Sequence, residues 1–156
     1  MKVYLVQHGD SVKKEANPER PLSEKGKKDI ERLAEFIAKT NVTISQIVHS
    51  GILRAQQTAE TLGKIISFQG NIEEQSGLEP LDPIYPIVEE IENWQDGTLL
   101  AGHLPFVGKL AAKILTGNEH NNIIAFEPGT IVCLEKTEEN NWMINWMLRP
   151  ELSNKV

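Results

Sequence analysis

The chain has 156 residues, of which 40% are hydrophobic and 24% charged, and this composition excludes a disordered chain and a membrane-embedded one. Its 22 acidic and 16 basic residues give a net charge of −6, which argues against a nucleic-acid partner because phosphate backbones are bound through excess lysine and arginine. At this length we expect residues 1–156 to form a single domain.

The sequence also predicts a cytoplasmic protein that does not insert into a membrane. Its N-terminal apolar run, residues 3–6, is too short for a signal peptide or a membrane span. Cys133 is the only cysteine, so no disulfide can form within the chain, and this agrees with a reducing compartment.

The first half of the chain predicts two strand-helix units. Residues 2–6 are typical of a buried strand, and Ser23 then has the character of a helix N-cap. The helix that follows carries apolar residues at helical spacing: Ile30, Leu33, Ala34 and Ile37. Residues 44–50 predict a second strand and residues 51–66 a second helix, which Gly63 weakens near its end.

The middle of the chain predicts a loop-rich segment between two strands. Residues 71–74 form a short strand, and three prolines make residues 80–86 irregular. A short helix is expected at residues 88–94, and residues 98–103 predict the next strong strand.

The last part of the chain predicts a helix and a hairpin. Pro105 suits the first turn of a helix that ends at Gly117. Residues 130–136 and 142–149 alternate apolar and polar residues around the polar turn TEENN, which is typical of a hairpin. The expected fold class is therefore α/β, a three-layer α/β/α sandwich with a mainly parallel central sheet.

Polar residues follow three of these strands. His8 ends the first strand, Ser50 and Arg54 follow the second, and His103 ends the strand at residues 98–103. In an open parallel sheet, ligands bind at the carboxyl ends of the strands, so we expect these side chains to converge. Two imidazoles and a guanidinium beside helix N-termini predict a phosphate pocket.

Each of these residues also has a purely structural interpretation. His8 alone would more often be a structural histidine, and Arg54 could pair with a surface carboxylate. Arg54 falls in the first turn of its helix, where the dipole disfavours a cation, and this favours a ligand. The neighbouring histidines likewise favour close approach of a ligand as the reason for Gly9 and Gly102.

Three motifs carry a resemblance to a known family. The stretches QHGD, SGILRAQQTAE and GHLPFVG resemble the RHG, S-x-x-x-R-A-x-x-T and G-H-x-P signatures of the histidine phosphatase superfamily, in the same order. The chain is most similar to the small bacterial phosphohistidine phosphatases of the SixA type. This similarity is carried by the stretches RPLSEKG and INWMLRP and by a short length with no inserted cap domain. The resemblance covers nearly the whole chain and implies a phosphoglycerate-mutase-like fold.

The resemblance implies a covalent mechanism. His8 would attack phosphorus and form a phosphohistidine that water hydrolyses, while Arg54 and His103 bind the phosphoryl oxygens. Gly9 would leave room for the phosphoryl group. The family needs no metal or other cofactor, although a metal site of His8, Asp10 and His103 stays open on the sequence alone.

The general acid has two candidates. Many superfamily members use a carboxylate ahead of the third motif, where this chain has Glu79 and Asp82, and either could be an ordinary loop charge. The resemblance to the phosphohistidine subgroup implies that this acid is absent. A phosphoramidate leaving group is readily protonated and needs less help from an acid than an alkoxide does.

Gln7 departs from the family pattern, which has arginine at this position. A glutamine can donate neutral hydrogen bonds to phosphate but carries no charge, and one lost donor typically costs about 100 to 1,000-fold in rate. Arg20, in the loop before the first helix, either supplies the missing charge to the phosphate or is an ordinary surface arginine.

The sequence leaves three functions open. The first is a phosphatase for phosphohistidine on a protein, such as a phosphotransfer domain or a phosphocarrier. The second is a weakened or inactive relative that binds phosphate or phosphohistidine, which Gln7 suggests. The third is a phosphomonoesterase for small phosphorylated substrates, which would need a competent acid.

Overall fold

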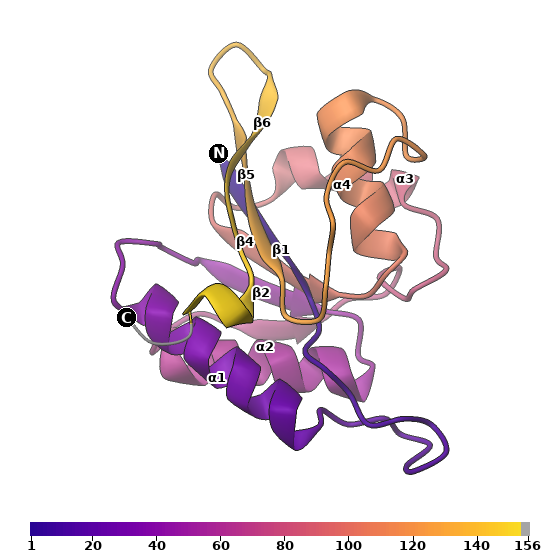
Figure 1. Ribbon diagram of the computed structural model, residues 1–156. Coiled ribbons are helices and arrows are strands. Elements are labelled where there is room, and N and C mark those ends of the chain that lie inside the picture. Colours follow the sequence, from indigo (N-terminus) through magenta and orange to yellow (C-terminus); the bar gives the residue numbers. More distant parts are fainter. Residues whose placement is uncertain (154–156) are drawn as a thin grey trace.

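The computed structural model describes residues 1–153 (Figure 1). Its strands are β1 (Lys2–Gln7), β2 (Gln46–His49), β3 (Ile72–Glu74), β4 (Thr98–Gly102), β5 (Ile131–Lys136) and β6 (Trp142–Leu148). Its α-helices are α1 (Glu24–Ala38), α2 (Leu53–Ile65), α3 (Tyr85–Glu90) and α4 (Phe106–Thr116), and its short 3₁₀ helices are η1 (Ile91–Asn93) and η2 (Pro150–Ser153).

The strands form one mixed sheet in the order β3-β2-β4-β1-β5-β6. The first four strands along the chain pair in parallel, and β5 pairs antiparallel with both β1 and β6. This arrangement confirms the predicted fold class, with a parallel sheet extended by a C-terminal hairpin.

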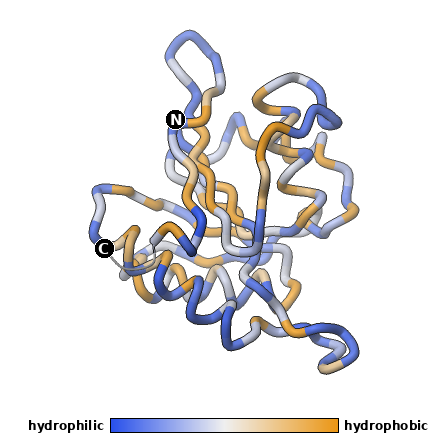
Figure 2. Tube along the Cα trace, in the orientation of Figure 1, coloured by the Kyte–Doolittle hydropathy of each residue, from blue (hydrophilic) through white to orange (hydrophobic). Residues whose placement is uncertain are grey.

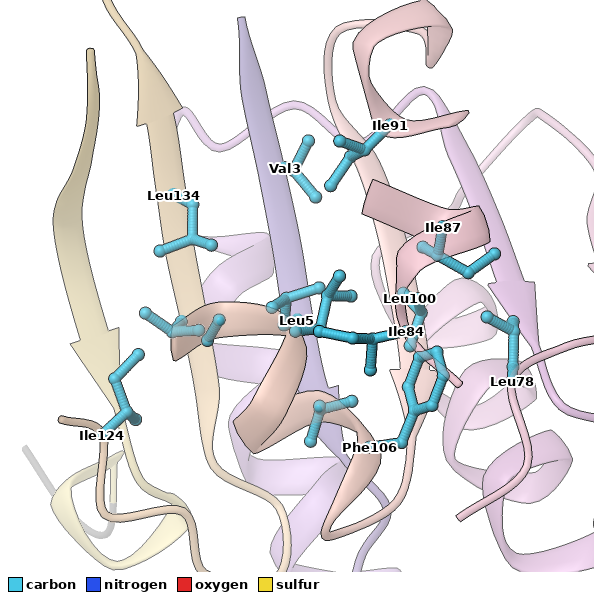
Figure 3. Close-up of a cluster of buried hydrophobic side chains, with 14 of the residues drawn as sticks. Val3, Leu5, Leu78, Ile84, Ile87, Ile91, Leu100, Phe106, Ile124 and Leu134 are labelled. Atoms are coloured by element: carbon cyan, nitrogen blue, oxygen red, sulfur yellow. The ribbon is translucent and has the colours of Figure 1, made fainter. Parts of the chain in front are cut away.

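Helices cover both faces of the sheet. Figure 1 shows α1 and α2 on one face and α3 and α4 on the other. Side chains of β1 alternate between the two faces, so that Val3 and Leu5 point into one hydrophobic cluster, which also includes Ile91 and Phe106 (Figure 3). Tyr4 and Val6 point the other way, into the cluster beneath α1 and α2. The sheet therefore has a separate hydrophobic core on each face.

The sequence also determines where the helices begin and end. Ser23 accepts the backbone N–H of Gly26 at 3.0 Å and caps α1, as its residue type predicts. Gly117 ends α4 with a φ of 81°, a left-handed conformation that glycine adopts without steric cost. Pro105 directly precedes α4, in agreement with its predicted place at the start of that helix.

Three sequence predictions need correction in detail. The helix expected at residues 88–94 begins at Tyr85, because Pro86 lies in the first turn, where its missing N–H leaves no bond unmade. The second strand is shorter than residues 44–50 and spans Gln46–His49. The strand β5 does not alternate, since Ile131–Leu134 are all buried between two helical layers.

Hydropathy follows the layers (Figure 2). Hydrophobic residues lie along the strands, and the β5–β6 turn and the loop from β1 to α1 are mainly hydrophilic. Among residues 1–153, no helix combines the length and the apolar character needed to cross a bilayer.

Candidate active site

The predicted site residues converge at the carboxyl ends of β1, β2 and β4. The ring centroids of His8 and His103 lie 5.2 Å apart. Nε of Arg54 lies 3.3 Å from Nε2 of His8 and donates a hydrogen bond to it. Side chains that are far apart in the sequence therefore share one small site, as their places at the carboxyl ends of parallel strands predicted.

Strand pairing explains this convergence. In the parallel register, Gln7 lies opposite Gly102, so the residues that follow, His8 and His103, leave the sheet side by side. The backbone N–H of His8 donates to the carbonyl of Gly102 at 2.9 Å and fixes this relation. The neighbouring strand β2 ends at the same edge and leads into Ser50.

His8 is held as a neutral imidazole in one tautomer. Its Nδ1 lies 2.7 Å from the carbonyl oxygen of Gly9, which can only accept, so Nδ1 carries the proton. The pKa of His8 is lowered to about 4, mainly by burial and also by the charges of Arg54 and Arg20, while the Gly9 bond and Asp10 oppose the shift. At neutral pH, Nε2 therefore has a lone pair.

His103 is buried and neutral as well. The pKa of His103 is lowered to about 3, mainly by burial and also by the nearby His8, Arg54 and Arg20. Its Nε2 lies 2.7 Å from Oγ of Ser50. The position of Ser50 after the second strand predicted that it lies near the site, but not its contact with His103.

Thr58 connects the helix that carries Arg54 to the loop that carries His8. Its hydroxyl donates to the backbone carbonyl of Arg54 at 2.8 Å and accepts the backbone N–H of Gly9 at 3.1 Å. Thr58 is fully buried. Thr58 is the threonine of the S-x-x-x-R-A-x-x-T pattern, but the sequence alone does not predict its contact with Gly9.

Gly9 is explained by packing within the protein. A Cβ built on Gly9 would lie 2.9 Å from Cγ1 of Ile30 and 3.2 Å from Cδ2 of Leu22. It would also lie 3.3 Å from the carbonyl oxygen of Gly26. The side-chain direction at this position thus faces α1 and the core, so a side chain here would press on α1.

Gln7 occupies the position at which the family pattern has arginine. Its side chain is 8% exposed, and alternation along β1 places it on the same face as Leu5, toward α4. Its amide oxygen is buried, and no residue among 1–153 makes a hydrogen bond to it. A buried acceptor without a partner is costly, and a phosphoryl oxygen, itself an acceptor, could be bound only by the NH₂ group of this side chain.

Hydrogen bonds to its own loop hold the Arg20 guanidinium beside the site. Its backbone has a φ of 48°, and its guanidinium donates to the carbonyl of Val12 at 3.3 Å and to Oγ of Ser11 at 3.1 Å. Its charge lowers the pKa of both His8 and His103. These contacts hold a cation close to the two histidines.

Glu79 and Asp82 do not join the histidines. Asp82 accepts the backbone N–H of Glu79 at 2.9 Å and closes a turn with it, and Glu79 is exposed. Neither carboxylate is among the charges that shift the pKa of His8 or of His103. Within residues 1–153, no group of three or more histidine, cysteine, aspartate or glutamate side chains could hold a metal ion.

The site combines a neutral histidine with a guanidinium and a second imidazole at the edge of an α/β sheet, an arrangement suited to an anion. The sequence profile of the histidine phosphatase superfamily (branch 1) matches residues 3–81. The chain belongs to this superfamily and is a hydrolase of the phosphatase class.

Known proteins resemble the chain over nearly its whole length. Phosphohistidine phosphatase SixA of Escherichia coli (strain K12) is 26% identical over 155 residues, which cover 96% of this chain and 94% of that protein. A structure of the protein histidine phosphatase SixA complexed with tungstate superposes with a TM-score of 0.81 at 26% identity, over 97% of this chain and 99% of that one.

The fold also occurs in an enzyme for a small phosphorylated substrate. A mycobacterial glucosyl-3-phosphoglycerate phosphatase in complex with VO3 has a TM-score of 0.71 over 93% of this chain and 97% of that one. Its identity is 15%, so this likeness concerns the fold alone.

Proposed function

We propose that this protein hydrolyses phosphohistidine on a partner protein, through a covalent phosphohistidine intermediate on His8. The observation that carries the proposal is the state of His8. Its imidazole is neutral, and the bond to the Gly9 carbonyl keeps the proton on Nδ1. Its Nε2 lies beside Arg54. Such a nitrogen is a competent nucleophile toward phosphorus.

The reaction has two steps. Nε2 of His8 attacks the phosphorus in line, and the bond between phosphorus and the substrate imidazole breaks. The leaving imidazole departs as a neutral ring when its other nitrogen carries a proton. Water then attacks the phosphoryl group on His8 and releases inorganic phosphate, which regenerates the neutral imidazole.

The neighbouring groups would stabilise the charge on the phosphoryl oxygens. Arg54 supplies a guanidinium at the nucleophile, and His103 supplies a ring 5.2 Å from that of His8. Arg20 contributes further positive charge, because it lies close enough to depress the pKa of both histidines. We propose that Arg20 replaces part of the charge that the family arginine provides at position 7.

Asp10 is the only carboxylate among the groups that shift the pKa of His8 or of His103. This scarcity of acids at the site favours a phosphoramidate substrate over a phosphate ester. An alkoxide leaving group needs a proton from a positioned acid, whereas an imidazole leaving group does not. The resemblance to SixA in sequence and in structure supports the same substrate class. A small phosphomonoester is therefore the weaker candidate, with Glu79 or Asp82 as its only predicted acids.

The partner would be a histidine-phosphorylated protein, such as a phosphotransfer domain or a phosphocarrier, in the cytoplasm. We also propose that residues 1–156 act as a single domain, without a metal or other cofactor. A binding module without turnover is the second candidate, and Gln7 is the observation that favours it, since its uncharged amide replaces a guanidinium.

Hydrolysis of a phosphohistidine peptide tests the proposal. The native chain should release phosphate, and His8→Ala should reduce the rate to background. An inactive native chain that gains activity in Gln7→Arg would support the binding module instead. Release of phosphate by His8→Ala at the native rate would contradict both candidates.

A further inference from the structure

Ser50 makes a buried contact with His103. Oγ of Ser50 lies 2.7 Å from Nε2 of His103, and the two residues are 8% and 1% exposed. The same oxygen accepts the backbone N–H of Ile52 at 3.2 Å. One hydroxyl therefore joins the loop after β2 to the histidine that follows β4.

Hydrogen-bond accounting distinguishes two arrangements. If Nε2–H of His103 donated to Ser50, both lone pairs of Oγ would be used and its own hydrogen would lack an acceptor among residues 1–153. If Ser50 donates to Nε2 instead, each of its groups is satisfied and the proton of His103 lies on Nδ1. The second arrangement leaves no buried hydroxyl hydrogen unpaired.

The other ring nitrogen agrees with the second arrangement. Nδ1 of His103 is buried, and no residue among 1–153 makes a hydrogen bond to it. Because Nε2 is bound to Ser50, Nδ1 is the ring nitrogen of His103 that has no partner among residues 1–153 and is left to bind a ligand. An N–H at this position attracts a phosphoryl oxygen, whereas a lone pair repels it.

We propose that Ser50 is a positioning residue that fixes the tautomer of His103, so that Nδ1–H donates to a phosphoryl oxygen of the substrate. The inference rests on the proposed function for the identity of the anion. Ser50 itself does not touch the substrate and acts only through the imidazole.

The tautomer can be read directly, without turnover. Long-range ¹H–¹⁵N correlation NMR of the ¹⁵N-labelled native chain at neutral pH distinguishes protonated from unprotonated ring nitrogens, and His103→Ala assigns the signals. We expect His103 with its proton on Nδ1. In Ser50→Ala the Nε2–H form should become populated, and Ser50→Thr, which keeps a hydroxyl, should restore the native form.

Two results would overturn the inference. One is a native His103 with its proton on Nε2, a reading that does not depend on any variant folding. The other is an unchanged His103 tautomer in Ser50→Ala. If the tautomer behaves as expected but phosphohistidine is not hydrolysed, the proposed function fails and the role of Ser50 stands.

Anion affinity separates positioning from a general structural role. Ser50→Ala should weaken tungstate binding about tenfold, the scale of one charge-assisted hydrogen bond. In a His103→Ala background, the same substitution should have no further effect, because Ser50 acts through that ring. An equal loss in both backgrounds would contradict a positioning role.

Discussion

Nε of Arg54 donates to Nε2 of His8 across 3.3 Å, and this contact comes from residues that are 46 positions apart. The bond requires a lone pair on Nε2, and the bond from Nδ1 to Gly9 independently requires a proton on the other nitrogen. Two separate contacts thus select the same tautomer of His8. Arg54 has to release Nε2 when phosphorus approaches, and its guanidinium is then beside the developing charge.

The first prediction concerns the protonation of His8. Since burial lowers its pKa to about 4, the Hε1 resonance of His8 should not titrate between pH 8 and pH 5.5. The spectrum of His8→Ala identifies the His8 resonance in the same NMR titration. A His8 resonance with a midpoint near 6.5 would show an ordinary, solvated imidazole.

A linked prediction concerns stability. The unfolded chain binds a proton at His8 near pH 6.5 and the folded chain only near pH 4, so the unfolded state binds more protons between these values. The stability that neutral His8 contributes is full above pH 6.5 and is lost as the pH falls toward 4. Urea unfolding between pH 7 and pH 4.5 should show this loss, and the loss should be smaller in His8→Gln.

The third prediction tests Arg20 as a source of charge. Arg20→Gln keeps a polar side chain but removes its charge, and it should weaken tungstate binding about 10 to 100-fold by the usual strength of charged hydrogen bonds. Lys14→Gln, at an exposed position in the same loop, is the matched control. Equal affinity of Arg20→Gln and the native chain would leave Arg20 with a structural role only.

The fourth prediction concerns Gln7. Gln7→Arg restores the charged donor of the family pattern, and it should raise the rate of phosphohistidine hydrolysis by up to about 100 to 1,000-fold. If Arg20 already supplies that charge, the gain in the native background should be smaller than the gain in Arg20→Gln. Gains of the same size in both backgrounds would mean that the two positions act independently.

The fifth prediction concerns Gly26, which fixes the loop after His8 against α1. A Cβ on Gly26 would lie 2.0 Å from the carbonyl oxygen of Asp10. Gly26→Ala should therefore lower the free energy of unfolding by roughly 1–3 kcal/mol or more, since the backbone must move. Lys27→Ala, at the next and exposed position, should change the free energy little, and both can be measured by urea unfolding.

Much of the fold could be predicted because local patterns and tertiary packing agree. Ser23 has the residue type of an N-cap, and in the structure it caps α1. The start of α3 was missed because prolines suggested a loop, although Pro86 is well suited to a first turn. The uniform burial of β5 was missed because the strand was interpreted as one arm of a hairpin with alternating faces, although Ile131–Leu134 are consecutive apolar residues.

The site was predictable only in part. Strand ends indicated that His8, Arg54 and His103 would converge, and the family pattern gave each of them a role. The roles of Ser50 and Thr58 depend on hydrogen bonds between distant loops, which no local pattern encodes. The close packing of Gly9 on Ile30 likewise depends on how α1 docks, which the sequence alone does not show.

The central claim is that His8 carries the phosphoryl group during turnover. The most direct measurement is rapid alkaline quench of the native chain with a phosphoramidate substrate, followed by mass spectrometry of the peptide that contains His8. The account predicts a phosphoryl group on His8 that is absent in His8→Ala. Steady turnover with the label on another residue, or with no covalent label at any quench time, would contradict it.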